Sequence, residues 1–182
     1  MEEYAVILDF LAQGTAGGPK YGKREPLAYA VGEKEFRLFE LVPKATANIL
    51  VGDRVFIGRD EGKREVIDHV KRRIGFNDLT SNAASELEYA VVQIVLDDEA
   101  KYIQFYNNAE AINLKKHLLE ELPGLGKKSV GAILESRKQG PFQSFDDLSA
   151  RAGIKNPEKY IAARICLEIQ DPDRKRYLFV SR

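Results

Sequence analysis

The sequence predicts an α+β protein of two domains. A five-stranded β-barrel of the OB type spans residues 1–79, and an all-α domain with two helix-hairpin-helix units spans residues 80–182. Short apolar runs separated by turn residues fill the first segment, as strands do. Apolar residues recur at helical spacing in the second segment. A polar, turn-forming stretch at residues 77–82 separates the two patterns, and we place the domain boundary there.

The first domain contains five predicted strands, each a short apolar run bounded by turn residues. They span residues 4–11, 26–31, 35–42, 54–58 and 64–73. A long loop with four glycines follows the first strand, and a connector at residues 44–51 separates the third strand from the fourth. These connections fit a small closed or partly open OB barrel. An SH3-like barrel is the alternative, which strand count alone does not separate.

The second and third strands and the flanking loops form the ligand face of an OB barrel, which binds nucleic acid or oligosaccharide. Aromatic and basic side chains in these regions suit stacking on bases and contact with phosphate. The candidates are Lys20, Tyr21, Lys23, Arg24, Tyr29, Phe36, Lys63 and Arg64. The sequence leaves open the alternative that the aromatic residues fill the barrel and the charged residues face water.

Helices account for the second domain. Apolar spacing predicts helices over residues 82–96 and 98–106, followed by an amphipathic helix that leads into a glycine turn. That third helix is marked by Ile112, Leu114, Leu118, Leu119 and Leu122. After the partner helix of the turn, Ser144 is placed to cap the next helix. A last helix over residues 158–169 precedes a short strand or tail at residues 174–182.

Residues 122–129, Leu-Pro-Gly-Leu-Gly-Lys-Lys-Ser, form the turn of the first helix-hairpin-helix. Pro123 ends the preceding helix, and the two glycines permit backbone angles closed to other residues. Backbone N–H groups at the start of the next helix lack partners within it and lie at its positive end, so they suit a phosphate oxygen. The predicted phosphate-binding set is Gly124, Leu125, Gly126, Lys127, Lys128 and Ser129. The alternative is a turn used only for packing or protein contact.

A second hairpin is predicted around residues 152–158. It has a single glycine, Gly153, and Glu158 stands at the start of its second helix. An acid at that position repels phosphate, so we expect this hairpin to pair with the first one and bury a shared apolar face. The first hairpin presents no group that reads a base edge, so its contact positions a nucleic-acid backbone without specifying sequence.

Charge balances in this chain, with 28 basic and 28 acidic residues. Nucleic-acid binding must therefore rest on local patches rather than on a broad positive field. One cysteine excludes an intramolecular disulfide, and His69 and His117 form no metal motif, so we expect neither metal nor cofactor. No apolar run is long enough to span a membrane, and the acidic N-terminus is not a secretory signal, which predicts a cytoplasmic protein.

The hairpin segment resembles the double helix-hairpin-helix modules of DNA-uptake and DNA-repair proteins over residues 109–170. The resemblance rests on residues 122–129, Ile133, Leu134, Arg137 and residues 141–148. Val130 departs from the pattern, which usually has a small residue, often alanine, after the hydroxyl position.

The whole chain resembles an archaeal family of unknown function that joins an N-terminal OB-like barrel to a C-terminal double helix-hairpin-helix. Besides the hairpin, the matching stretches are residues 4–9, 32–36, 42–44, 54–58, 72–74 and 78–80, with Phe105 and residues 108–109. Such proteins are generally described as nucleic-acid binders, often of RNA. The resemblance implies that role for this chain.

The expected function is nucleic-acid binding without catalysis, with RNA favoured over DNA. The barrel holds the strand, the first turn grips a phosphate, and the two modest sites reinforce each other through effective concentration. One alternative is a protein-interaction adaptor of the transcription or translation machinery, which the zero net charge favours. Another is a DNA-repair lyase or glycosylase, with Lys128 as nucleophile and Asp146 as the accompanying aspartate.

Overall fold

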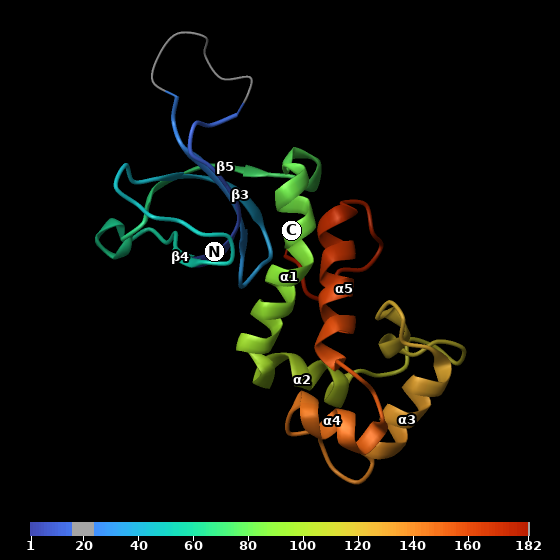
Figure 1. Cartoon of the computed structure of the whole chain (residues 1–182). Coiled ribbons are helices and arrows are strands. Elements are labelled where there is room, and N and C mark those ends of the chain that lie inside the picture. Colours follow the sequence, from blue (N-terminus) through green and yellow to red (C-terminus); the bar gives the residue numbers. More distant parts are fainter. Residues whose placement is uncertain (16–23, 182) are drawn as a thin grey trace. The chain divides into compact units, whose positions relative to one another are not determined.

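The computed structural model describes residues 1–15 and 24–181 (Figure 1). The fold is α+β, as predicted, with one curled five-stranded antiparallel half-barrel and five α-helices in the described residues. The chain divides into a strand unit, Met1–Ala90 with Glu168–Arg182, and a helical unit, Val91–Leu167. This division groups the first part of the helix α1 (Ser81–Asp97) and the C-terminal tail with the strands, whereas the sequence suggested a boundary between residues 79 and 80.

The strands of the half-barrel follow the order β4-β1-β2-β3-β5, and each neighbouring pair is antiparallel. Their bounds are β1 Tyr4–Leu11, β2 Leu27–Gly32, β3 Leu38–Pro43, β4 Arg54–Phe56 and β5 Ile67–Ile74. The five predicted strands are confirmed, although four of them start later or end earlier than predicted. Because β4 and β5 stand at opposite ends of the order, the sheet is open between them.

The core of the half-barrel lies inside the curl and is built from alternate strand positions. Its members are Ala5, Ile7, Ala28, Ala30, Leu41, Ile49, Val55, Ile57 and Ile67. Alanines in β1 and β2 take little room, so the sheet can curl around the larger isoleucine side chains. Register shifts between β1 and β2 and between β3 and β5 add local twist.

The opposite face of the sheet meets the start of α1 (Ser81–Asp97). The Thr80 hydroxyl donates to Asp9 Oδ2 at 2.6 Å and accepts the Ala83 N–H at 3.1 Å. One side chain therefore caps the helix and satisfies a buried carboxylate on β1. This contact fixes where α1 begins on the sheet.

The other helices are α2 Glu99–Asn108, α3 Lys127–Arg137, α4 Phe145–Ala152 and α5 Pro157–Gln170. The predicted cap of α4 is confirmed, because the Ser144 hydroxyl accepts the Asp147 N–H at 3.0 Å. Gly153 ends α4 in the left-handed conformation, with φ +71°. Across the described residues, none of these helices is both long and apolar enough to cross a membrane.

The prediction of a helix before the glycine turn is wrong. Residues 109–117 form a loop closed by a bridge between Ala111 and His117, and only Leu118–Glu121 form a 3₁₀ turn, η3. Asn113 Oδ1 accepts the N–H groups of Lys115 at 2.8 Å and Lys116 at 2.9 Å, which replaces helical hydrogen bonding. Leu114 is fully exposed at the tip of this loop, so its helical spacing was accidental.

Residues 171–181 form a tail without strand or helix, which agrees with one of the two predicted alternatives. The tail is held by the buried carboxylate of Glu168, which accepts the backbone N–H groups of Leu178, Phe179 and Val180. Farther along, the Ser181 N–H donates to the Glu35 carbonyl at 3.3 Å. Both contacts lie within the strand unit.

The contact between Thr80 and Asp9 predicts a stability difference between two substitutions. Thr80→Val should lower the free energy of unfolding by about 2 kcal/mol, because it removes a helix cap and a partner of a buried carboxylate. Thr80→Ser keeps the hydroxyl and should stay within about 0.5 kcal/mol of the parent. Urea denaturation measures both values, and equal midpoints for the two variants would contradict the assigned contact.

Candidate functional site

The glycine turn at residues 122–129 has one glycine that its shape requires. Gly124 has φ +84°, and a Cβ placed on it would lie 3.2 Å from Cε1 of Tyr160. A side chain there would be both strained and crowded. Leu125 is buried, and its N–H donates to the Leu122 carbonyl at 3.2 Å, so this residue anchors the turn from inside.

Gly126 differs from Gly124, because nothing within the chain requires a glycine there. It is the N-cap of α3 with φ −80°, and a Cβ placed on it would meet no atom within 4 Å. No side chain caps this end of α3. Helical hydrogen bonding begins where Val130 donates to the Gly126 carbonyl, so the first-turn N–H groups have no acceptor within the helix. A side chain at position 126 would extend into open space.

Positive charge gathers at the same end of α3. Lys127 and Lys128 are exposed, and neither forms an ion pair with any described residue. The first turn of α3 holds no acid. The lysines therefore add to the positive end of the helix dipole, and a chain without net charge presents a local cationic spot here. Ser129 is half-buried in the same turn.

An ion pair that the sequence did not reveal supports this turn. Arg164 of α5 is 1% exposed, and its Nη1 lies 2.8 Å from Oε2 of Glu121 and 3.2 Å from the Glu121 carbonyl oxygen. Lys116 Nζ lies 2.9 Å from the other carboxylate oxygen. Lys116 and Arg164 hold the pKa of Glu121 below its usual value. The end of η3 is thereby fixed to α5 immediately before the turn.

The second turn has a different chemistry. Its φ-positive residues are Gly153 at +71° and Asn156 at +50°. α5 begins with Pro157, which has no N–H to offer, and Glu158 follows in its first turn. This helix start therefore presents fewer donors and an added negative charge, in contrast to the start of α3.

The candidate residues of the sheet separate into several groups. Lys20, Tyr21 and Lys23 lie outside the described residues. Tyr29 is 3% exposed and Phe36 is 2% exposed, so both rings lie largely within the fold and neither presents an open face to a base. Tyr29 faces the covered side of the sheet, and Phe36 turns inward from a backbone with φ +58°.

The basic candidates of the sheet also differ from one another. Arg24 and Lys63 are exposed. Arg64 is bound to its own loop, since its Nε donates to the Gly58 carbonyl at 2.8 Å and its Nη1 to the Asp68 carbonyl at 3.2 Å. Its guanidinium therefore shapes the loop between β4 and β5.

A polar row crosses the covered face of the sheet, and the sequence did not indicate it. Asp9, Tyr29, Glu40 and Arg72 are neighbours in register on β1, β2, β3 and β5. Arg72 donates to both carboxylate oxygens of Glu40 at 2.8 Å. Burial, with Glu40 adding to it, raises the pKa of the Tyr29 hydroxyl. The pair of Arg72 and Glu40 joins β5 to β3.

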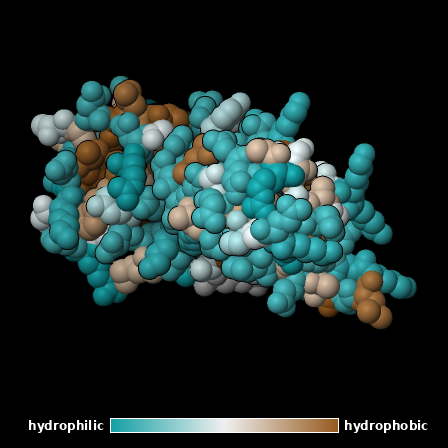
Figure 2. Space-filling model, turned by 90° about the horizontal axis from the view of Figure 1, so that it is seen from below, coloured by the Kyte–Doolittle hydropathy of each residue, from teal (hydrophilic) through white to brown (hydrophobic). Residues whose placement is uncertain are grey.

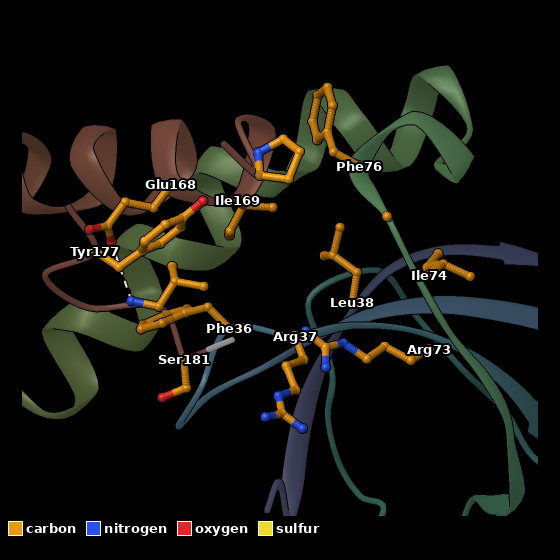
Figure 3. A pocket seen from close by; sticks show the side chains of 13 residues that line it. Phe36, Arg37, Leu38, Arg73, Ile74, Phe76, Glu168, Ile169, Tyr177 and Ser181 are labelled. Carbon is orange, nitrogen blue, oxygen red and sulfur yellow. Dashed lines mark hydrogen bonds between the residues drawn. The ribbon is translucent and has the colours of Figure 1, made fainter. Parts of the chain in front are cut away.

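A pocket of about 170 Å³ lies in the strand unit (Figure 3). Its walls come from the residues that lead into β3 (residues 36–38), the end of β5 with the turn after it (residues 73–76), and the end of α5 with the tail that follows (residues 168–181). Three segments far apart in the sequence build this pocket, which explains why no local pattern predicted it.

The cap of η3 predicts a pH-dependent stability. His117 Nδ1 accepts the Leu119 N–H at 3.0 Å, so the ring must stay unprotonated at that nitrogen; burial, followed by Arg137, lowers the pKa of His117. The unfolded chain takes up its proton at higher pH than the folded chain. The free energy of unfolding should therefore be fully retained above pH ~6.5 and fall below it.

Urea unfolding of the parent and of His117→Asn between pH 5 and 8 checks this prediction. Asparagine caps without titrating, so the variant should lose less stability on acidification than the parent. Parallel curves for the two proteins would exclude the proposed linkage. Glu121 does not interfere, because its pKa is lowered and its contribution to the free energy of unfolding is lost only below about pH 4.5.

Comparison with known proteins places the chain in a family. Residues 1–181 match the family described as "Protein of unknown function (DUF655)". The uncharacterised protein MJ0038 of Methanocaldococcus jannaschii is 42% identical over 181 residues, which is 99% of this chain and 80% of that protein. The crystal structure of Af1531 from Archaeoglobus fulgidus has 44% identity and a TM-score of 0.90, covering 99% of this chain and 100% of that one. The chain belongs to the DUF655 family.

Proposed function

We propose that this chain is a non-catalytic nucleic-acid-binding protein. Its helical unit acts as a double helix-hairpin-helix whose first turn grips a backbone phosphate, and its strand unit acts as an OB-like barrel that holds the strand. The open space in front of Gly126 is the observation that carries this proposal. Neither backbone strain nor packing requires a glycine at position 126, where capping side chains are favoured. A glycine there leaves room for an external acceptor to approach closely.

The chemistry of the turn selects phosphate over other ligands. Uncapped N–H groups, the positive end of α3, and the charges of Lys127 and Lys128 all favour an anion with several acceptor oxygens. The absence of a base-reading group gives a grip that is independent of sequence. The preference for RNA over DNA follows from the family resemblance, since a phosphate contact does not sense the 2′-hydroxyl.

The proposal assigns no catalytic role because the candidate lysine nucleophile is exposed to solvent. A lysine nucleophile must be desolvated to be reactive at neutral pH. Lys128 is exposed, and Asp146 is exposed in the first turn of α4. Neither has the buried setting of a Schiff-base site, so phosphate contact is the better role for Lys128.

An adaptor for a protein partner is the second candidate function. Leu50 is 65% exposed and Val51 is 48% exposed in the connector before β4. Figure 2 shows a largely hydrophilic face on which hydrophobic surface gathers over the strand unit. Crosslinking in cell extract, followed by sequencing of bound nucleic acid, separates the two functions and distinguishes RNA from DNA.

The paired substitution Lys127→Glu and Lys128→Glu tests the phosphate grip. We expect affinity for a 20-nucleotide RNA at low salt to fall at least tenfold, because two attractions become repulsions. The slope of log affinity against log salt should also become shallower by about 1 to 2. Fluorescence anisotropy measures both quantities. Unchanged affinity would remove the turn from the binding site, and salt-independent binding by the parent would exclude phosphate contact altogether.

Substitutions at the two glycines of the turn give a sharper test, because one should abolish RNA binding without loss of stability and the other should lower stability. Gly126→Asp places a carboxylate where it caps α3 and repels phosphate, so stability should hold or rise by a few tenths of a kcal/mol while RNA binding is lost. Gly124→Ala should cost about 1 kcal/mol of stability, because its φ is positive. Full RNA affinity in Gly126→Asp would contradict the proposed site.

A further inference from the structure

We propose that the pocket of the strand unit binds a single pyrimidine nucleotide, with the base among the apolar walls and the phosphate at Arg73. This inference rests on the proposed function and deepens it, because it names the part of the ligand that the strand unit selects. The ligand has two sources, a free nucleotide or one residue of a strand. The experiment below distinguishes them.

The walls of the pocket suit a flat apolar ring. Figure 3 shows three aromatic side chains around the pocket. Phe76 after β5 and Tyr177 in the tail are half-buried and offer ring surface, whereas Phe36 before β3 is 2% exposed and is buried within the wall. Leu38 and Ile74, which are cross-strand neighbours, complete the apolar lining. Bases bind such surfaces through stacking and apolar contact, which every base can make with its face.

The volume of the pocket limits the ring that it accepts. An apolar cavity of about 150 Å³ is known to hold one benzene ring. At about 170 Å³, this open-sided pocket encloses roughly one six-membered ring, which is a larger fraction of a pyrimidine than of a purine. Size therefore favours uracil or cytosine over adenine or guanine.

Charge at one side of the pocket supplies the phosphate contact. Figure 3 shows Arg37 and Arg73 on the same side, away from Phe76. Arg37 pairs with Glu35, which also receives the N-terminal ammonium of Met1. Arg73 is exposed and forms no ion pair or side-chain hydrogen bond with the described residues. Its guanidinium is the charge left to meet an anion.

The pocket is held in shape before any ligand arrives. The buried Glu168 carboxylate binds three consecutive N–H groups of the tail. The Tyr177 hydroxyl donates to the Asp171 carbonyl at 2.8 Å. The Gly75 N–H donates to Asp78 Oδ2 at 2.9 Å, which fixes the 3₁₀ turn η2 (Phe76–Asp78). A preformed site spends little of its binding energy on ordering itself.

Titration of the full chain with uridine 5′-monophosphate tests the pocket directly. Methyl NMR should show shifts at Leu38, Ile74 and Ile169, and no shift at Ile133 in the helical unit. Adenosine 5′-monophosphate and uncharged uridine should each bind about tenfold more weakly, because one exceeds the pocket and the other lacks the phosphate. Unmoved methyl signals, or equal affinity for the two nucleotides, would overturn the assignment.

Substitutions separate the contribution of the Arg73 charge from that of the apolar wall of the pocket. Arg73→Gln should reduce the affinity for uridine 5′-monophosphate to that for uridine, and Phe76→Ala should weaken binding of both. Arg59→Gln, which removes an exposed charge of the strand unit away from the pocket lining, is the control and should bind as the parent does. Arg73 is exposed, so its variant tests the proposal even if Phe76→Ala fails to fold. Parent-like binding by Arg73→Gln would contradict the phosphate contact.

Ten-nucleotide oligouridylate and oligoadenylate strands provide the last arm. The parent should prefer oligouridylate, and Arg73→Gln should lose that preference. The Lys127→Glu, Lys128→Glu variant should weaken both strands equally and keep the preference. Binding of uridine 5′-monophosphate without any strand binding would support the pocket as a free-nucleotide site and reject the proposed function. Strand binding without preference would reject the pocket and leave the function standing.

Discussion

The buried guanidinium of Arg164 is the constraint on which the helical unit depends. An arginine keeps its proton in any protein environment, so a buried one must be matched by acceptors. Glu121 supplies a carboxylate oxygen at 2.8 Å and its own carbonyl, which locks the end of η3 to α5. The glycine turn begins at the next residue. The position of Gly126, and of the donors that follow it, is thus set by a side chain outside the turn.

In the strand unit the buried charged groups are carboxylates, and each of them is matched by hydrogen-bond donors. Glu40 is matched by Arg72 across the sheet, and Asp9 by Thr80 at the start of α1. Glu168 binds three N–H groups of the tail and holds it against the strand unit, where tail residues complete the pocket. Each buried charge joins segments that are distant in the sequence. Because each buried charge needs a partner, its burial fixes which distant segments lie side by side.

Apolar periodicity and turn chemistry were enough to predict the strands, most helices and the cap at Ser144, because these features depend on neighbouring residues. The helix before the turn failed where Asn113 and His117 bind nearby N–H groups, a local competition that apolar spacing does not report. Arg164 and the pocket depend on partners many residues away, so spacing could not reveal them. The available signal was a lone charge within an apolar run, as at Glu40 and Arg164.

A chain without net charge gains little from long-range attraction, so the proposed binding must come from two small contacts of different kinds. A phosphate grip supplies affinity that salt weakens and sequence does not alter. A ring-sized pocket supplies selection, because its walls respond to the shape of a base. When one strand reaches both, the second contact forms at a high effective concentration, and modest sites suffice. Selectivity and salt dependence are then carried by different units and can change independently.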